Sequence, residues 1–156
     1  MMLSSIVAVV ATAAAPLTQT GTFHIDLAPA QAMPLFTAAG ERRWAKGWDP
    51  EMLSGDTQRG SVFRTRAHGR ETTWIVTDYR PDEGRASYAR LVDGHDIGLV
   101  DVAVRANGNG STVTVTYTMT ALGADAQPGV AAFLDPAHFA GFIEEWRTSI
   151  EAALRR

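Results

Sequence analysis

The stretch "DPAHFAGFIEEWRTSIEAAL", residues 135 to 154, decides how the rest of the chain is interpreted. Asp135 is a good N-cap residue, and Pro136 suits the first position of a helix. Apolar side chains then recur at spacings of three and four, at Phe139, Phe142, Ile143, Trp146, Ile150 and Leu154. This spacing predicts one long amphipathic helix with a single apolar stripe. Such a stripe needs an apolar surface to cover.

An antiparallel sheet that supplies this surface is predicted upstream. In "STVTVTYTMTAL", residues 111 to 122, valine, tyrosine and methionine alternate with threonine, so that one face packs and the other meets water. Asn-Gly and Asp-Gly pairs separate the neighbouring segments, as in hairpins. We therefore expect six strands, at residues 20–27, 61–68, 71–79, 85–92, 97–106 and 111–122. With the terminal helix they make an α+β fold.

Short helices are expected between the first strand and the other five. Pro29 suits the first turn of a helix, and an apolar stripe follows it. Pro34 interrupts that stripe, which predicts a kink or a break between two short helices. Residues 47–60 are rich in turn-forming residues.

Composition limits the class of protein. A chain of 156 residues corresponds to one domain, which we place at residues 19–156. The net charge is −3 and a single lysine is present, which argues against nucleic acid as a partner. The absence of cysteine excludes disulfides, thiolate nucleophiles and cysteine-ligated zinc.

The first 18 residues are interpreted as an apolar leader. The triplet Ala13-Ala14-Ala15 resembles a signal cleavage site, but no lysine or arginine precedes Arg42. The apolar run is too short for stable insertion into a membrane, which takes roughly 20 residues. We expect a cytoplasmic protein, and export is the alternative if residues 1–15 act as a signal.

No metal site or cofactor is predicted. The histidines are far apart in the sequence, at His24, His68, His95 and His138. A metal site needs three or four ligands that converge. We expect His24 to face solvent from the first strand, and His68 and His95 to be exposed in turns.

Four segments carry a resemblance to a known superfamily: "GERRWAKGWDP" (40–50), "GSVFRTRAHGRETTWIVTDY" (60–79), "NGNGSTVTVTYTMTAL" (107–122) and "FIEEWRTSIEAAL" (142–154). Together with the order of elements, they resemble the SRPBCC superfamily of START lipid-transfer domains, polyketide cyclases and Bet v-type pollen allergens, and most of all its uncharacterised bacterial members. The resemblance implies a helix-grip fold, in which a curved sheet wraps around the terminal helix and leaves a cavity between them. That plan often has seven strands, and the seventh would fall between residues 45 and 60.

Candidate residues for the wall of this cavity are aromatic, aliphatic or polar-tipped side chains of the sheet, the terminal helix and the segment after the short helices. They are Trp44, Trp48, Phe63, Trp74, Tyr88, Arg90, Val102, Tyr117, Met119, Phe142 and Trp146. No catalytic residue is assigned.

Two orientations stay open. Trp44 and Trp48 either form an aromatic gate for an apolar ligand or plug one end of the sheet, and the plug is favoured because large aromatic side chains dominate core energetics. Tyr88 and Arg90 share one face of their strand, and the wet convex face is favoured. An inward Arg90 would need a partner, such as an acidic ligand. If Phe63 and Thr65 face inward, Arg64 and Arg66 face outward.

Three functions compete. The first is binding or transport of a small apolar or amphipathic molecule in the cavity. The second is a polyketide cyclase-like or aromatase-like enzyme that uses the same cavity. The third is a stress-response or interaction module with a filled core and no ligand. The sequence does not predict an oligomeric state.

Overall fold

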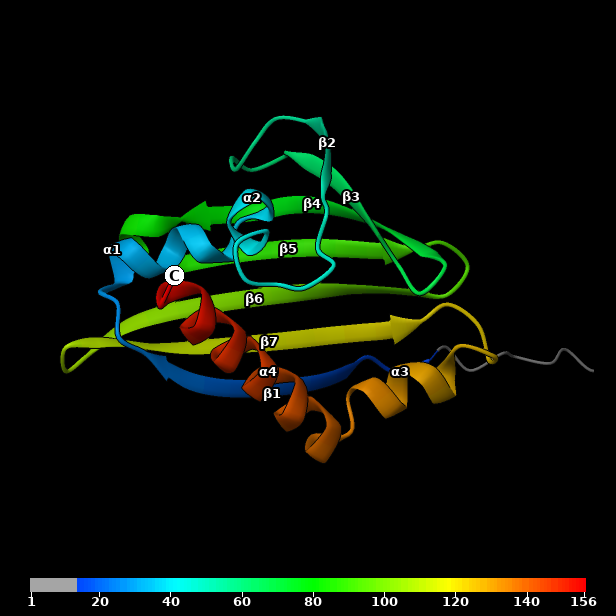
Figure 1. The fold of residues 1–156 in the computed structure, drawn as a ribbon. Helices are drawn as coiled ribbons and strands as arrows, with labels where there is room; N and C mark the ends of the chain where they lie inside the picture. Colours follow the sequence, from blue (N-terminus) through cyan, green and yellow to red (C-terminus); the bar gives the residue numbers. More distant parts are fainter. Residues whose placement is uncertain (1–13) are drawn as a thin grey trace, which may run out of the picture.

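The computed structural model describes residues 14–156 as a curved antiparallel sheet that wraps around a long helix (Figure 1). The sheet has seven strands in the order β1-β7-β6-β5-β4-β3-β2. Their bounds are β1 (Leu17–Ile25), β2 (Glu51–Ser54), β3 (Val62–Ala67), β4 (Arg70–Arg80), β5 (Arg85–Val92), β6 (Asp96–Asn107) and β7 (Gly110–Ala121). The predicted helix-grip fold is confirmed.

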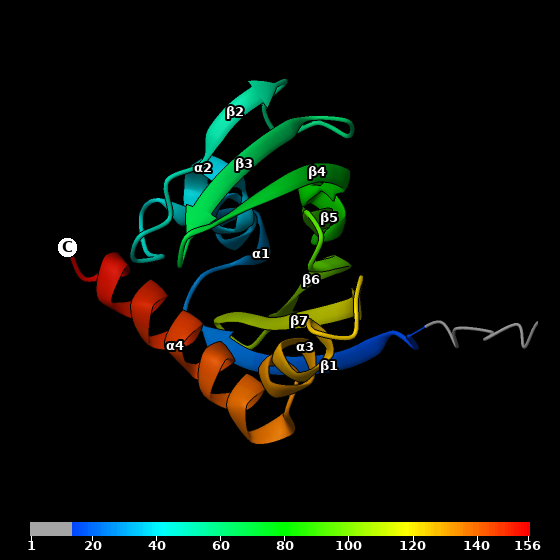
Figure 2. The same cartoon turned by 90° about the vertical axis from the view of Figure 1, so that its right-hand side faces the viewer.

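The helices gather on the concave side of the sheet. Figure 2 shows α4 crossing β1 and β7 there, with the short helices beside β4 and β5. The helices are α1 (Pro29–Ala32), η1 (Met33–Phe36), α2 (Ala38–Glu41), η2 (Pro81–Glu83), α3 (Gln127–Phe133) and α4 (Pro136–Leu154). The predicted break at Pro34 is present, because η1 separates α1 from α2.

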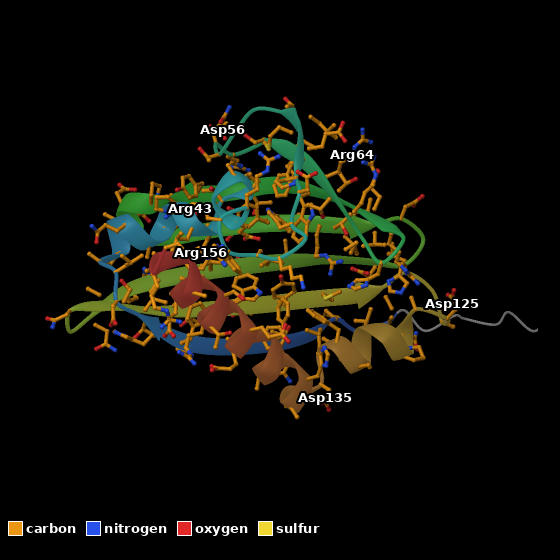
Figure 3. All side chains as sticks on the ribbon, in the orientation of Figure 1. Arg43, Asp56, Arg64, Asp125, Asp135 and Arg156 are labelled. Carbon is orange, nitrogen blue, oxygen red and sulfur yellow. The ribbon has the colours of Figure 1, made fainter. Side chains whose placement is uncertain are left out.

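The terminal helix α4 begins and packs as its sequence predicts. Asp135, at the start of α4 in Figure 3, accepts hydrogen bonds from the backbone N–H groups of Ala137 (3.1 Å) and His138 (3.2 Å). The apolar stripe of α4 is buried at Phe139, Ile143, Trp146 and Ile150. Gly21 of β1 allows the close approach of α4, since a Cβ atom there would lie 2.5 Å from Cγ1 of Ile143.

Strand register arranges the inward side chains in rows across the sheet. Tyr117 of β7 pairs with Val100 of β6, which pairs with Tyr88 of β5. The next row passes through Trp74, Arg90, Gly98 and Met119. These rows form part of the concave face of the sheet, which faces α4 and the short helices.

Three local features differ from the expectations. The seventh strand, β2, lies between residues 45 and 60, where the family plan places it, and all four of its residues are exposed. β1 begins at Leu17 instead of residue 20, because Leu17 still pairs with Met119. α3 was not predicted, since it contains Pro128 and Gly129.

The predicted leader lies mostly outside the described residues, which begin at residue 14. Within residues 14–156, no helix is long and apolar enough to cross a membrane.

Candidate functional site

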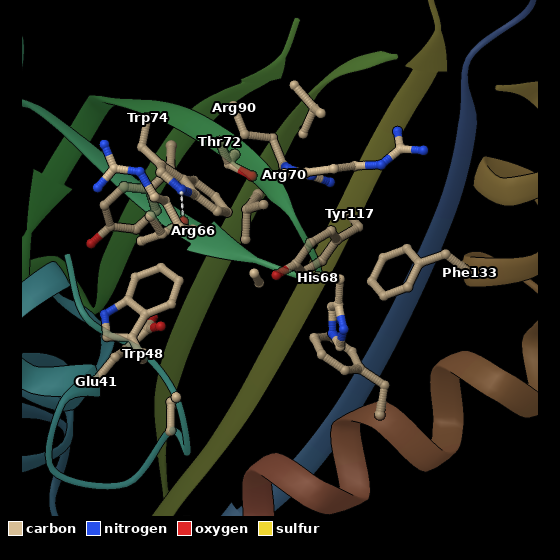
Figure 4. Close-up of a pocket in the computed structure, with 18 of the residues that line it drawn as sticks. Glu41, Trp48, Arg66, His68, Arg70, Thr72, Trp74, Arg90, Tyr117 and Phe133 are labelled. Carbon is tan, nitrogen blue, oxygen red and sulfur yellow. Dashed lines mark hydrogen bonds between the residues drawn. The ribbon is translucent and has the colours of Figure 1, made fainter. Parts of the chain in front are cut away.

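A cavity of about 460 Å³ lies between the concave face of the sheet, α4 and the segment that follows α2 (Figure 4). Most of its lining is apolar or aromatic. The exposed members of the lining mark its mouth, and they come from three places: Lys46 and Gly47, the β3–β4 hairpin (residues 66–68 and 70), and Gly129 of α3. His68 is exposed in this hairpin, as predicted, and has a positive φ of 52°.

All eleven candidate residues named from the sequence lie on the wall of this cavity. The structure therefore brings together residues from positions 44 to 146 of the chain. That they bind a ligand stays a prediction.

Trp44 and Trp48 belong to both the core and the cavity wall. The indole Nε1 of Trp44 donates a hydrogen bond of 2.8 Å to the carbonyl oxygen of Leu35, and Nε1 of Trp48 donates one of 2.8 Å to that of Ala38. Trp44 is 8% exposed and its ring centroid lies 5.1 Å from that of Trp146. The two alternatives posed for these residues are therefore not exclusive. Both side chains pack with the core and also line the cavity.

Trp48 packs edge-on against two aromatic rings of β3 and β4, those of Phe63 at 6.1 Å and Trp74 at 5.8 Å between centroids. The rings of Phe63 and Trp74 are nearly parallel, at 5° and 5.8 Å between centroids. Nε1 of Trp74 donates a hydrogen bond of 2.9 Å to the hydroxyl of Thr65.

Phe63 and Thr65 face inward, and Arg64 forms an ion pair with Glu51 on the outer side. Arg66, which alternation would then place outward, lies instead at the mouth of the cavity.

Tyr88 and Arg90 face the cavity, so the favoured placement on the convex face was wrong. Tyr88 is 6% exposed, and the side chain of Arg90 is 13% exposed. Alternation along β5 fixes only that the two share a face. Register places Arg90 between Trp74 and Gly98.

Arg90 finds its partner within the protein. Its Nη1 lies 3.3 Å from Oδ1 of Asp96, and its guanidinium carbon lies 5.5 Å from the centroid of the Trp74 ring. Nδ1 of His95 lies 2.7 Å from Oδ2 of Asp96. Nε of Arg90 and Oδ1 of Asp96 are buried without a hydrogen-bond partner among the described residues. Arg90, His95 and Asp96 form a polar cluster at one side of the cavity.

Sequence reasoning missed two members of this cluster. The segment "DGHD" (93–96) has the composition of a turn, which predicts exposure. In the structure, the side chain of His95 is only 24% exposed and that of Asp96 only 4%. The prediction of an exposed His95 was therefore wrong, because Asp96 begins β6 and holds the imidazole against the cavity wall.

Glu41 is a second acidic group on the cavity wall and was also missed. It ends α2, is partly buried, and lies beside Trp48 in Figure 4. Burial raises the pKa of its carboxyl group to about 8, so the group is mostly protonated at neutral pH. The pKa values of the Tyr88 and Tyr117 hydroxyls are also raised. Burial is the main cause for both, and the charge of an ionised Glu41 adds to it.

Clusters that fit a metal ion are not found among residues 14–156, where no three histidine, aspartate or glutamate side chains converge. His24 lies on the outer side of β1 and does not line the cavity. Its Nε2 atom lies 3.3 Å from Oδ1 of Asp26.

The sequence was compared with protein families and with curated proteins. Residues 17–154 match the family described as polyketide cyclase / dehydrase and lipid transport. No curated protein matches the chain.

Solved structures share the fold at low sequence identity. An uncharacterised protein from Rhizobium leguminosarum is 19% identical over 92% of this chain and 97% of its own, with a TM-score of 0.67. Major latex-like protein 151 from Panax ginseng is 13% identical over 88% and 96%, with a TM-score of 0.66. Norcoclaurine synthase from Thalictrum flavum is 8% identical over 96% and 98%, with a TM-score of 0.66. Likeness at such identities concerns the fold alone.

Proposed function

The chain belongs to the polyketide cyclase / dehydrase and lipid transport family, within the SRPBCC superfamily, and from this premise we propose that it binds a small amphipathic molecule in the cavity beneath α4. The observation that supports this proposal is the cavity inside the fold. Its volume of about 460 Å³ falls within the range of roughly 300–1,000 Å³ that is usual for small-molecule sites.

The mechanism of binding is burial. Apolar surface removed from water contributes roughly 25 cal/mol per Å². The aromatic rings of Trp48, Trp74 and Phe142 offer flat apolar faces to the ligand, and a few polar groups set its orientation. An interaction module without a ligand would instead need a filled interior.

Native mass spectrometry of the protein purified from its own host tests this proposal. We expect a small molecule to co-purify with the wild type. Val102→Phe places a larger side chain in the cavity and should abolish this co-purification. The matched control is Ile75→Phe on the convex face, where the side chain is 40% exposed, and it should retain the molecule. The proposal is abandoned if no molecule co-purifies and none binds from a panel of lipids and polyketides.

A cyclase-like enzyme is the second candidate, and a specific observation supports it. Titratable groups from four elements line the cavity, namely Glu41, Tyr88, Arg90, Asp96 and Tyr117. An enzyme of this kind needs such groups near a bound substrate. Incubation of the co-purified molecule with fresh protein distinguishes the two functions, because a binding protein leaves its mass unchanged and an enzyme produces a new species.

Location and domain bounds stay predictions as well. We infer a single domain, which the sequence places from residue 19 and to which β1 adds Leu17 and Thr18, and a cytoplasmic location, with export as the alternative. N-terminal sequencing of the protein from its host would reveal whether residues 1–15 are removed.

A further inference from the structure

His95 is fixed on the wall of the cavity by its backbone and by its ring. Its backbone N–H donates a hydrogen bond of 2.9 Å to the carbonyl oxygen of Val92, and its own carbonyl oxygen accepts one of 2.8 Å from the N–H of Leu122. Its ring Nδ1 lies 2.7 Å from Oδ2 of Asp96, whose side chain is only 4% exposed. The imidazole ring is therefore held in one orientation beside the cavity.

The contact with Asp96 decides which ring nitrogen is free. Asp96 forms an ion pair with Arg90, and a carboxylate only accepts hydrogen bonds. Nδ1 of His95 therefore carries the hydrogen atom, and Nε2 of the neutral ring keeps its lone pair. Nε2 has no hydrogen-bond partner among residues 14–156. A carboxylate behind an imidazole whose Nε2 is free is the arrangement of a general base.

Arg90 is held by the other oxygen of the same carboxylate. Its Nη1 lies 3.3 Å from Oδ1 of Asp96 and 3.4 Å from Sδ of Met119. Its Nη2 makes no hydrogen bond in the described part of the chain, yet it is not one of the buried atoms that lack a partner. Nη2 is therefore accessible from the cavity that Arg90 lines. One buried aspartate thus positions a base and a cationic hydrogen-bond donor at the same side of the cavity.

His95 lies at the border between water and the apolar interior. Its side chain is 24% exposed, and a Cβ atom at Gly129, at the mouth, would lie 3.8 Å from its Nε2. The rings of Trp74, Phe133 and Phe142 line the same cavity. Enzymes that handle reactive intermediates close their sites to water. A base that water reaches is better suited to a reaction in which water takes part, which is hydrolysis.

Water itself is the nucleophile that this base would activate. No serine among residues 14–156 lines the cavity, and the chain has no cysteine. The side chains that most often act as nucleophiles beside a histidine are therefore missing from the described wall. Without a covalent nucleophile, the substrate needs a good leaving group. Aryl esters meet this need, because phenols are far more acidic than aliphatic alcohols or amines.

We propose that the protein hydrolyses aryl esters in this cavity, with His95 as the general base and Asp96 as the residue that positions it. The inference rests on the proposed function, because the aromatic body of the ester occupies the cavity. Nε2 of His95 takes a proton from water while the water oxygen bonds to the carbonyl carbon of the ester. Nη2 of Arg90 donates a hydrogen bond to the carbonyl oxygen, on which negative charge develops. The bond to the phenolic oxygen then breaks, the imidazolium returns its proton to the phenolate, and a carboxylic acid and a phenol are released.

Two probes, 2-naphthyl acetate and 2-ethoxynaphthalene, test this chemistry. They share a naphthalene body, but only the ester can be hydrolysed. Hydrolysis is followed by the fluorescence of the released 2-naphthol, and binding of the ether is measured by isothermal titration calorimetry. The wild type should bind the ether and turn over many equivalents of the ester. Its rate should exceed that of the same concentration of free imidazole by at least about 100-fold, because a positioned acid–base group contributes a factor of this order.

Histidine variants assign the activity. His95→Gln should lower kcat about 100-fold and change the dissociation constant of the ether by less than about twofold. The matched control is His24→Gln on the outer side of β1, where the imidazole also has an aspartate, Asp26, within 3.3 Å but does not line the cavity. This control should keep kcat within about twofold of the wild type.

Asp96→Asn tests the positioning role. Asparagine no longer fixes the tautomer of His95, so kcat should fall at least about tenfold while the affinity for the ether is kept. The matched control, Asp26→Asn, should change neither quantity. Because Asp96→Asn also lowers stability, both quantities are measured well below its unfolding transition. A parallel loss of hydrolysis and of ether binding would show a structural role instead and would overturn the assignment of Asp96.

The outcomes separate this inference from the proposed function. If the ether binds but the ester is hydrolysed no faster than by free imidazole, the protein is still a binding protein and the hydrolytic site is refuted. If His95→Gln keeps the activity, or His24→Gln loses it, His95 is not the base and the inference is refuted as well. If neither probe binds, the inference fails, whereas the proposed function is decided by the molecule that co-purifies in native mass spectrometry.

Discussion

The hydroxyl of Tyr88 donates a hydrogen bond of 2.6 Å to the carbonyl oxygen of Phe36, which lies 52 residues earlier in the chain. This bond ties β5 to η1 and so holds the short helices over the cavity. Tyr117 lies two strands away in the same row, and its hydroxyl has no such partner among residues 14–156. We therefore expect different roles for these two buried tyrosines, because only the hydroxyl of Tyr88 stabilises the fold through a hydrogen bond to a described residue.

Phenylalanine at each position should separate these roles. Tyr88→Phe should lower the free energy of unfolding by about 1–2 kcal/mol, because the buried carbonyl oxygen of Phe36 loses its donor. Tyr117→Phe should change it by less than about 0.5 kcal/mol, since its hydroxyl makes no hydrogen bond to the described residues that could be lost. Urea unfolding followed by circular dichroism measures both. Equal losses in the two variants would contradict the assignment.

Glycine substitutions test how α4 packs on the sheet. Gly21→Ala should lower the free energy of unfolding by about 1–3 kcal/mol, because the new methyl group would lie 2.5 Å from Cγ1 of Ile143. Gly141 lies in α4, like Ile143, and a Cβ atom added there would have nothing within 4 Å. Gly141→Ala should therefore raise the free energy of unfolding by about 0.5–1 kcal/mol, because alanine has the higher helix propensity. Thermal unfolding of the two variants should shift in opposite directions. A neutral Gly21→Ala would show that α4 is not pressed against β1.

The cluster of Arg90, His95 and Asp96 should behave as one unit. Asp96→Asn leaves the guanidinium charge of Arg90 buried without a counter-ion and should cost about 3 kcal/mol of unfolding free energy. Arg90→Met should also lower the free energy of unfolding, because it leaves the buried carboxylate of Asp96 without the guanidinium group. The double variant should lose at least about 1 kcal/mol less than the sum of the two, as expected for residues in contact. Additive losses, measured by urea unfolding, would show that the pair is not coupled.

The sequence predicted those elements in which the spacing of apolar residues shows which face is buried. β7 alternates strictly and α4 carries one stripe, so both could be assigned from single residues and their spacing. β2 could not, because it has four residues that are all exposed and hence no alternation between a wet and a buried face. The order of elements then implied the cavity through the family resemblance, and not through the pattern alone.

The polar part of the site depends on long-range contacts and was harder to predict. Alternation on β5 shows that Arg90 and Leu91 lie on opposite faces, and hydrophobicity favours burying leucine. In the structure Arg90 is buried instead and Leu91 is 38% exposed. Arg90 can be buried because its guanidinium group pairs with Asp96 and lies over the ring of Trp74. Glu41 lies in a charged segment typical of a surface. Nothing local signals that the following turn and Trp48 enclose it.

Glu41 should make the stability of the protein depend on pH in a specific window. Its pKa rises from 4.5 in the unfolded chain to about 8 in the folded protein. Between these values the unfolded chain has lost the proton while the folded protein keeps it, so the free energy of unfolding should fall as pH rises from 4.5 to 8. The full difference corresponds to at most about 5 kcal/mol, and the partial exposure of Glu41 reduces this.

Glu41→Gln should remove this loss, because the amide cannot ionise. The variant should match the wild type near pH 4.5 and exceed its stability by roughly 1–3 kcal/mol at pH 8.5, where a buried carboxylate without a partner is most costly. Urea unfolding at several pH values measures the difference. The matched control is Glu145→Gln on the exposed side of α4, whose stability curve should stay parallel to that of the wild type. If Glu41→Gln also runs parallel, water or a cation reaches the carboxyl group in the folded protein, and the group is ionised at neutral pH.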